Sequence, residues 1–127
     1  MKKMIRIGAA LGTAALLVTG LASPASASGK FNSGSTSIVS RDDGLYVGTL
    51  EVQVYTYGAA SYHADIWGPG FKRNLKTEYV TGNRRYIDYV KLNRVFREGD
   101  RICAQGWKYN GHGYDSLGLP CFTIHAS

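Results

Sequence analysis

The feature that most constrains this chain is a two-residue alternation of apolar and polar side chains that recurs between short turn signals. It is clearest in residues 45–57, LYVGTLEVQVYTY, where Leu50 and Val54 fall on one face and Glu51 and Gln53 fall on the other. Successive side chains of a β-strand point to opposite faces, so this pattern predicts a strand with one buried face. Because no stretch shows a helical period with helix caps, we expect a chain built from strands.

The same pattern recurs along the rest of the chain, separated by turn sequences such as DDG at 42–44 and EGD at 98–100. The expected strands are residues 38–41, 45–57, 61–67, 75–81, 84–96, 101–109 and 114–125. The segment at 75–81 is short and polar, as is typical of an edge strand. About seven short strands with this spacing predict an all-β fold, a small antiparallel β-sandwich of immunoglobulin-like shape. A small Greek-key barrel is the alternative.

The N-terminal segment has the three parts of a secretory signal peptide. MKKMIR supplies positive charge, an apolar stretch follows from about residue 7 to residue 21, and SPASAS ends at a small-residue cleavage site. The apolar stretch is shorter than the ~20 residues that span a bilayer. We therefore predict that residues 1–27 are removed and that the protein is secreted, with no membrane contact after cleavage.

The predicted mature chain divides into an arm and one domain. Residues 28–37, SGKFNSGSTS, are rich in serine and glycine and hold one aromatic residue, Phe31, so we expect a flexible N-terminal arm. Residues 38–127 form the β-sandwich domain. Removing the three cations of residues 1–27 from the total of 15 leaves 12 against 9 acidic residues, so the net charge falls from +6 to +3. This mild charge does not predict a nucleic-acid partner.

The two cysteines, Cys103 and Cys121, both lie in the mature chain and are expected to pair outside the cell. The loop that they enclose corresponds to about 3 kcal/mol of stabilisation in the loop-closure model. If they lie opposite each other, Trp107 faces Leu117 and a short loop at 111–113 closes the hairpin. We expect Trp107 to lie in the core, and a bulge near 117–120 would shift this register by one residue.

Residues that could carry catalysis are few. His63 and Asp65 share a strand face, and a carboxylate in that place can orient an imidazole, but no nucleophile motif accompanies them. A half-exposed strand pair is the simpler interpretation. His112 and His125 lie at a loop tip and near the C-terminus, where we expect solvated side chains. No spacing typical of a metal site is present. We therefore expect no enzyme activity, no metal and no cofactor.

The stretch HADIWGPGFKRN, residues 63–74, suggests a binding surface instead. It places Trp67 and Phe71 around a tight turn, and Lys72 and Arg73 follow. Proline fixes one backbone angle of such a turn and the glycines permit the others. Aromatic and arginine side chains are enriched at protein interfaces. We interpret this segment as a docking turn, with a purely structural turn as the alternative.

Cations outnumber acids by nine to four between residues 72 and 101. Such a basic stripe suits an acidic protein surface or a cell-wall polymer, although a solvated face of mixed charge has the same composition. The candidate partner-binding residues are Phe31, Trp67, Phe71, Lys72, Arg73, Arg84 and Arg85.

Several motifs give the chain a resemblance to a known group. They are the alanine-rich leader ending in ASASGK, the IWGPG turn, and a final hairpin in which Cys103 and Trp107 face a G-x-P-C sequence ending at Cys121. The chain resembles the small secreted single-disulfide β-domain proteins of actinobacteria. It is similar to the adaptor subunit of their secreted umbrella-shaped toxin particles, which act in bacterial competition. This resemblance implies an adaptor that joins other secreted proteins, a large repeat-containing toxin chain and a lectin.

Two other functions are compatible with the residues. A secreted inhibitor of proteases or glycosidases would present one rigid loop, for which 68–71 and 110–114 are candidates. A carbohydrate-binding module would use the nine tyrosines and two tryptophans as stacking surfaces. All three are non-enzymatic binding functions, and the sequence alone does not choose among them.

Overall fold

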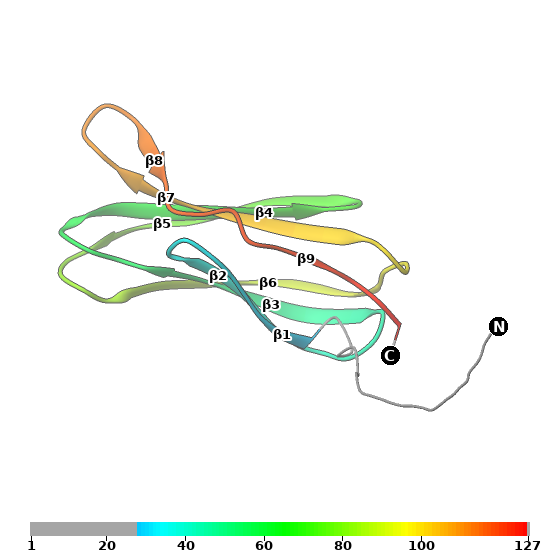
Figure 1. Ribbon diagram of the computed structural model, residues 1–127. Coiled ribbons are helices and arrows are strands. Elements are labelled where there is room, and N and C mark those ends of the chain that lie inside the picture. The colour runs from blue at the N-terminus through cyan, green and yellow to red at the C-terminus, as the bar shows by residue number, and fades with distance from the viewer. Residues whose placement is uncertain (1–27, 127) are drawn as a thin grey trace, which may run out of the picture.

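The computed structural model describes residues 28–126, and in this range the chain forms nine β-strands and no helix (Figure 1). The strands are β1 (Ser28–Ser33), β2 (Thr36–Arg41), β3 (Tyr46–Tyr55), β4 (Ala60–Gly68), β5 (Phe71–Val80), β6 (Arg85–Val95), β7 (Arg101–Tyr109), β8 (Tyr114–Ser116) and β9 (Cys121–Thr123). The predicted signal peptide, residues 1–27, lies outside the described residues.

The strands form two antiparallel sheets that pack face to face (Figure 1). The first sheet has the order β1-β2-β3-β6. The second has the order β5-β4-β7-β8, and β9 also pairs with β7. The predicted all-β sandwich is therefore confirmed.

The predicted alternation determines which residues form the core. On β3, Leu50, Val52 and Val54 are fully buried between the sheets, and on β4 the same holds for Tyr62 and Ile66. These residues come from opposite sheets, so each strand contributes one apolar face to a shared interior. Burial of such faces is the main favourable contribution to folding.

The N-terminal segment differs from the sequence prediction. Residues 28–37 were expected to form a flexible arm, and this is wrong because residues 28–33 form β1, which pairs with β2 along its whole length. Phe31 lies opposite Ile38 and stacks on Phe122, with ring centroids 4.6 Å apart. Composition alone suggested disorder. However, a polar strand can be ordered when a neighbouring edge satisfies its backbone and one aromatic side chain reaches the core.

Strand β5 is an edge strand, as predicted, but it begins at Phe71 and is ten residues long. Side chains of β6 bind its free backbone near the bulge: Asp88 accepts from the Lys76 amide at 2.8 Å, and the Tyr86 hydroxyl donates to the Lys76 carbonyl. Both unpaired groups at Lys76 are thereby satisfied, which links the two sheets along this edge.

The C-terminal hairpin carries the predicted disulfide. Cys103 lies opposite Cys121, and the two are bonded. Nearer the loop, Trp107 pairs with Ser116 instead of the expected Leu117. The intervening residues 117–120 therefore contain one extra position, which divides the expected strand at 114–125 into β8 and β9.

The irregular segment at 117–120 also holds the β1–β2 turn. The Ser35 amide donates to the Leu117 carbonyl at 2.8 Å, and the Leu119 amide donates to Ser33 Oγ at 3.2 Å. Gly118 has φ +129°, and a Cβ placed there would lie 1.9 Å from the Ser33 carbonyl oxygen. Only glycine permits this approach, which ties the first sheet to the second.

Residues 125 and 126 contact Glu98 in the turn before β7. The Ala126 amide donates to Glu98 Oε1 at 2.6 Å, and the His125 ring contacts the other carboxylate oxygen. The Ala126 amide, and then His125, hold the pKa of Glu98 below its usual value. His125 is exposed, as the sequence suggested, and its ring contacts Glu98.

Candidate functional site

The outer face of the second sheet is unusually aromatic. In a two-sheet sandwich this face normally meets solvent and is polar. Here the outward positions of β4 and β7 include His63, Trp67 and Trp107, and β8 adds Tyr114. A solvent-facing surface with this composition is typical of an interaction site.

Four rings on this face form a continuous line, which we call the aromatic row: Tyr109, Tyr114, His63 and Trp107. The Tyr109 and Tyr114 rings are 5.3 Å apart, Tyr114 meets the edge of His63 at 4.5 Å, and His63 stacks on Trp107 at 6.2 Å. The indole of Trp107 donates to Asp65 Oδ1 at 2.8 Å. These contacts fix the orientation of each ring.

The prediction that Trp107 lies in the core is wrong. Along β7, Ile102, Ala104 and Gly106 face the interior, so alternation turns Trp107 outward. At Gly106 a Cβ would lie 2.4 Å from Thr36 Oγ1, so the sheets are too close there for any larger residue. Trp107 is half-buried because it packs on the outer face, not between the sheets.

In the part of the chain that the structure describes, no hydrogen bond joins His63 to Asp65. Asp65 accepts the indole proton of Trp107, and His63 Nδ1 has no hydrogen-bond partner among the described residues. The His63 ring is held by Trp107 and Tyr114 instead. His63 therefore lies between the rings of Trp107 and Tyr114 in the aromatic row.

The β7–β8 hairpin, which carries Tyr109 and Tyr114, projects away from the body of the sandwich (Figure 1). We call residues 109–116 the projecting hairpin; Tyr109 and Tyr114 are 42% and 41% exposed. Asn110 makes the loop rigid, because its Oδ1 accepts from the His112 and Gly113 amides, both at 2.9 Å. Asn110 Nδ2 also donates to Asp115 at 3.0 Å.

The opposite end of the same face contains a cavity of about 430 Å³, which we call the Trp67 cavity. Its lining residues are Asp65, Trp67, Gly68, Phe71, Lys72 and Gln105. Trp67 pairs with Lys72 on β5, and Asp65 pairs with Gln105 on β7, so the sheet itself brings these groups together. Three of the predicted residues, Trp67, Phe71 and Lys72, meet here.

The turn at 68–71 forms one wall of this cavity and is held from the first sheet. Arg94 donates to the Pro69 carbonyl and lies over the Phe96 ring at 4.2 Å. Phe71 meets the edge of Phe96 at 6.2 Å and is half-buried. A Cβ at Gly68 would lie 2.7 Å from the Phe71 ring, so this glycine lets Phe71 reach the interior.

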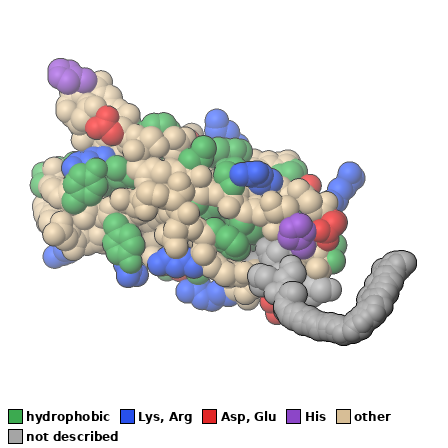
Figure 2. All heavy atoms as spheres, in the orientation of Figure 1, with side chains coloured by type: hydrophobic (Ala, Val, Ile, Leu, Met, Phe, Trp, Pro, Cys, Tyr) green, Lys and Arg blue, Asp and Glu red, His purple; other side chains and the backbone are tan. Residues whose placement is uncertain are grey.

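The remaining candidate residues do not join this site. Phe31 stacks inside the molecule on Phe122, so it is not the exposed anchor that a flexible arm would carry. Arg84 immediately precedes β6 and Arg85 begins it, in the first sheet, whereas Arg73 is on β5 in the second. Lysine and arginine side chains are spread over the visible surface and interspersed with other residues (Figure 2).

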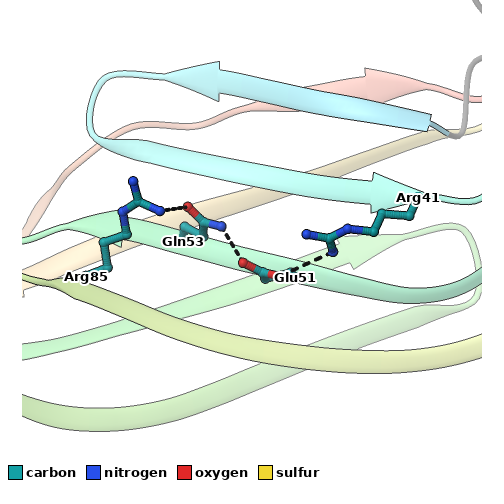
Figure 3. A network of polar contacts seen from close by, with 4 residues as sticks. All are labelled: Arg41, Glu51, Gln53 and Arg85. Atoms are coloured by element: carbon teal, nitrogen blue, oxygen red, sulfur yellow. Dashed lines mark hydrogen bonds and ion pairs between the residues drawn. The ribbon is translucent and has the colours of Figure 1, made fainter.

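Arg85 belongs to a polar network on the outer face of the first sheet (Figure 3). Arg85 contacts Gln53 Oε1 at 3.4 Å, Gln53 donates to Glu51, and Arg41 contacts Glu51 at 3.4 Å. Glu51 is only 8% exposed. The four side chains lie in a line across β2, β3 and β6 and satisfy one another, which explains how a carboxylate can be buried here.

A second cavity of about 300 Å³ lies beside this network. Its lining includes Glu51, Arg41, Tyr46 and Tyr89, next to the bulge at Val47/Thr49. Within it, Glu51 is already bonded to Gln53 and Arg41.

Residues 28–126 contain no group of three or more histidine, cysteine, aspartate or glutamate side chains that could hold a metal ion. In the same range there is no helix long and apolar enough to cross a membrane. Comparison of the chain with protein-family models, curated protein sequences and solved structures finds no match. The function must therefore be inferred from the residues of this chain.

Proposed function

We propose that the protein is a secreted, non-enzymatic adaptor that binds another secreted protein through the aromatic row and the projecting hairpin. The observation that carries this proposal is the chain of ring contacts from Trp107 to Tyr109 on a solvent-facing sheet. Exposed aromatic side chains in fixed orientations provide large contact areas at low entropic cost.

The rigidity of the loop supports a binding role. The Asn110 side chain accepts two amide protons, and the Asn110 amide donates to the Gly113 carbonyl at 2.9 Å. A loop that is ordered before association loses less conformational entropy on binding.

The resemblance to adaptor subunits of secreted toxin particles supports a more specific proposal, that this protein is such an adaptor. The partner is then a large repeat-containing chain, and the biological setting is competition between bacteria. The disulfide between Cys103 and Cys121 is compatible with a protein that works outside the cell. A rigid projecting loop also suits an inhibitor. The two functions differ in their partner, which is a large repeat-containing chain for an adaptor and a single hydrolase for an inhibitor.

The test is affinity capture from the culture supernatant of the producing organism, followed by mass spectrometry. The bait is the mature protein, compared with a Tyr109→Ser/Tyr114→Ser variant and with a Tyr89→Ser control on the opposite sheet. We expect the double variant to recover at least about tenfold less of one large secreted chain, while the control recovers it fully. Recovery of a single hydrolase would instead support the inhibitor, and equal recovery by all three baits would contradict the proposed surface.

A further inference from the structure

The Trp67 cavity has a chemical composition that an aromatic protein contact does not explain. Its lining combines two aromatic side chains, Trp67 and Phe71, with a carboxylate, an amide and an ammonium group. The polar groups come from Asp65, Gln105 and Lys72. A ligand must offer an apolar face and several hydrogen-bonding groups around its rim to satisfy both parts at once.

The polar groups are held in place by neighbours outside the cavity. Asp65 accepts the Trp107 indole proton through Oδ1, and Gln105 donates from Nε2 to Ser116 Oγ at 2.9 Å. These bonds orient both side chains while leaving further acceptor capacity on each, since a carboxylate and an amide oxygen each accept several hydrogen bonds. Lys72, opposite Trp67, brings a donor to the same space.

From this arrangement we propose that the Trp67 cavity binds a neutral pyranose unit of a polysaccharide. The C–H face of a pyranose ring packs on the indole, and its hydroxyl groups donate to Asp65 and Gln105 and accept from Lys72. An aromatic amino-acid side chain in the same place would leave these polar groups unpaired, at a cost in affinity. A phosphate group would lie against the Asp65 carboxylate and be repelled.

This site goes beyond the proposed adaptor surface and stands independently of it. Trp67 pairs with Cys103 beside the disulfide, whereas the projecting hairpin leaves the other end of β7. The two sites share one link, the hydrogen bond from Trp107 to Asp65. An adaptor with both sites would hold a protein at one end of the sheet and a glycan at the other.

The test uses the two indole N–H resonances of the mature protein, since Trp67 and Trp107 are its only tryptophans. The probes are hexasaccharides of β-1,4-glucose, β-1,3-glucose, β-1,4-xylose and β-1,4-N-acetylglucosamine, each titrated to millimolar concentration. We expect at least one probe to shift the Trp67 indole resonance in a saturable manner. Trp67→Ala should weaken the binding of that probe by at least about tenfold, measured by calorimetry.

Matched variants separate binding from folding. Lys72→Ala removes an exposed side chain and should also weaken binding, whereas Tyr89→Ala, on the opposite sheet, should not change it. Each variant is first shown to melt within a few degrees of the wild type. If no probe shifts the Trp67 resonance, or if Trp67→Ala and Lys72→Ala bind as well as the wild type, the proposal is wrong. Saturable binding of N-acetyltryptophanamide with no sugar response would also overturn it, because the cavity would then be a peptide pocket.

Discussion

Two buried tyrosine hydroxyls show how single residues constrain this fold. Tyr62 is fully buried, and its hydroxyl donates to the Tyr57 carbonyl at 2.6 Å while accepting from the Tyr57 amide at 3.1 Å. Tyr86 is also fully buried, and its hydroxyl donates to the Lys76 carbonyl across the sandwich edge. Each hydroxyl satisfies backbone groups that no strand pairing reaches, so each tyrosine contributes both packing and hydrogen bonding.

Tyr86 gives a prediction about alkaline stability. Burial, and then the charge of Asp88, raise the pKa of Tyr86 well above its ordinary value of 10.0. The raised pKa favours the folded state at pH values below the pKa that the tyrosine has in the unfolded chain. This stabilisation is lost as the pH rises above about 10, because the unfolded chain then releases the proton more easily. Tyr86→Phe should cost about 1 kcal/mol at pH 7 through the lost hydrogen bond, and this deficit should shrink at higher pH.

The measurement for Tyr86 is urea unfolding at pH 8 and near pH 11 for the wild type, Tyr86→Phe and Tyr57→Phe. Tyr57 is largely exposed, so its variant should follow the wild type at both values. If the difference in the free energy of unfolding between the wild type and Tyr86→Phe is the same at both pH values, Tyr86 does not cause the loss of stability at alkaline pH.

At the scale of elements, the contacts between the β1–β2 turn and residues 117–119 connect the two sheets. They depend on Gly118, where the Ser33 carbonyl oxygen occupies the space of a side chain. Gly118→Ala should therefore destabilise the protein by about 2–5 kcal/mol, from backbone strain and from steric overlap together. Gly82 also has positive φ but no atom within 4 Å of its Cβ position, so Gly82→Ala should cost only about 1–2 kcal/mol. Similar melting temperatures for the two variants would argue against a stabilising role for the contacts between the β1–β2 turn and residues 117–119.

Strand β1 yields a second prediction at this scale. Because Phe31 stacks on Phe122 and packs against the core, Phe31→Ala should lower the free energy of unfolding by about 2 kcal/mol. Lys30 lies on the other side of β1 and is exposed, so Lys30→Ala should change it by less than about 0.5 kcal/mol. Urea denaturation of both variants provides the check, and no loss of stability in Phe31→Ala would indicate that β1 is not docked.

The elements that the sequence predicted well are those with a clear alternation. Leu50, Val52 and Val54 were expected on one face of β3, and they are buried together. The pairing of Cys103 with Cys121 followed from their number and from the spacing of the hairpin. Local pattern and turn chemistry determine such features, so no knowledge of distant contacts was needed.

The features that the sequence did not predict depend on contacts between distant segments. Ordering of β1 requires Phe122, about ninety positions away, and the outward direction of Trp107 follows from how closely β2 approaches Gly106. The candidate site was predicted in part, because Trp67, Phe71 and Lys72 are near in sequence. Gln105 was missed because it reaches the cavity only through pairing of β4 with β7.

At the scale of the whole molecule, the disulfide supports the second sheet at the place where its strand pairing is irregular. It joins β7 to β9 on one side of the segment 117–120, and the projecting hairpin lies on the other. Replacing Cys103 and Cys121 with alanine should lower the free energy of unfolding by about 2–4 kcal/mol. Urea unfolding with and without reductant measures this, and an unchanged midpoint after reduction would contradict a structural role for the bond.

The proposed function requires that the projecting hairpin joins this protein to a larger secreted partner. Size-exclusion chromatography of the producing organism's culture supernatant, followed by immunodetection of this chain, tests that claim most directly. We predict that the wild type elutes in a complex far larger than a domain of about 100 residues, and that Tyr109→Ser/Tyr114→Ser elutes as the free domain. If the wild type elutes alone, or if the double variant stays in the large complex, the proposed function is wrong.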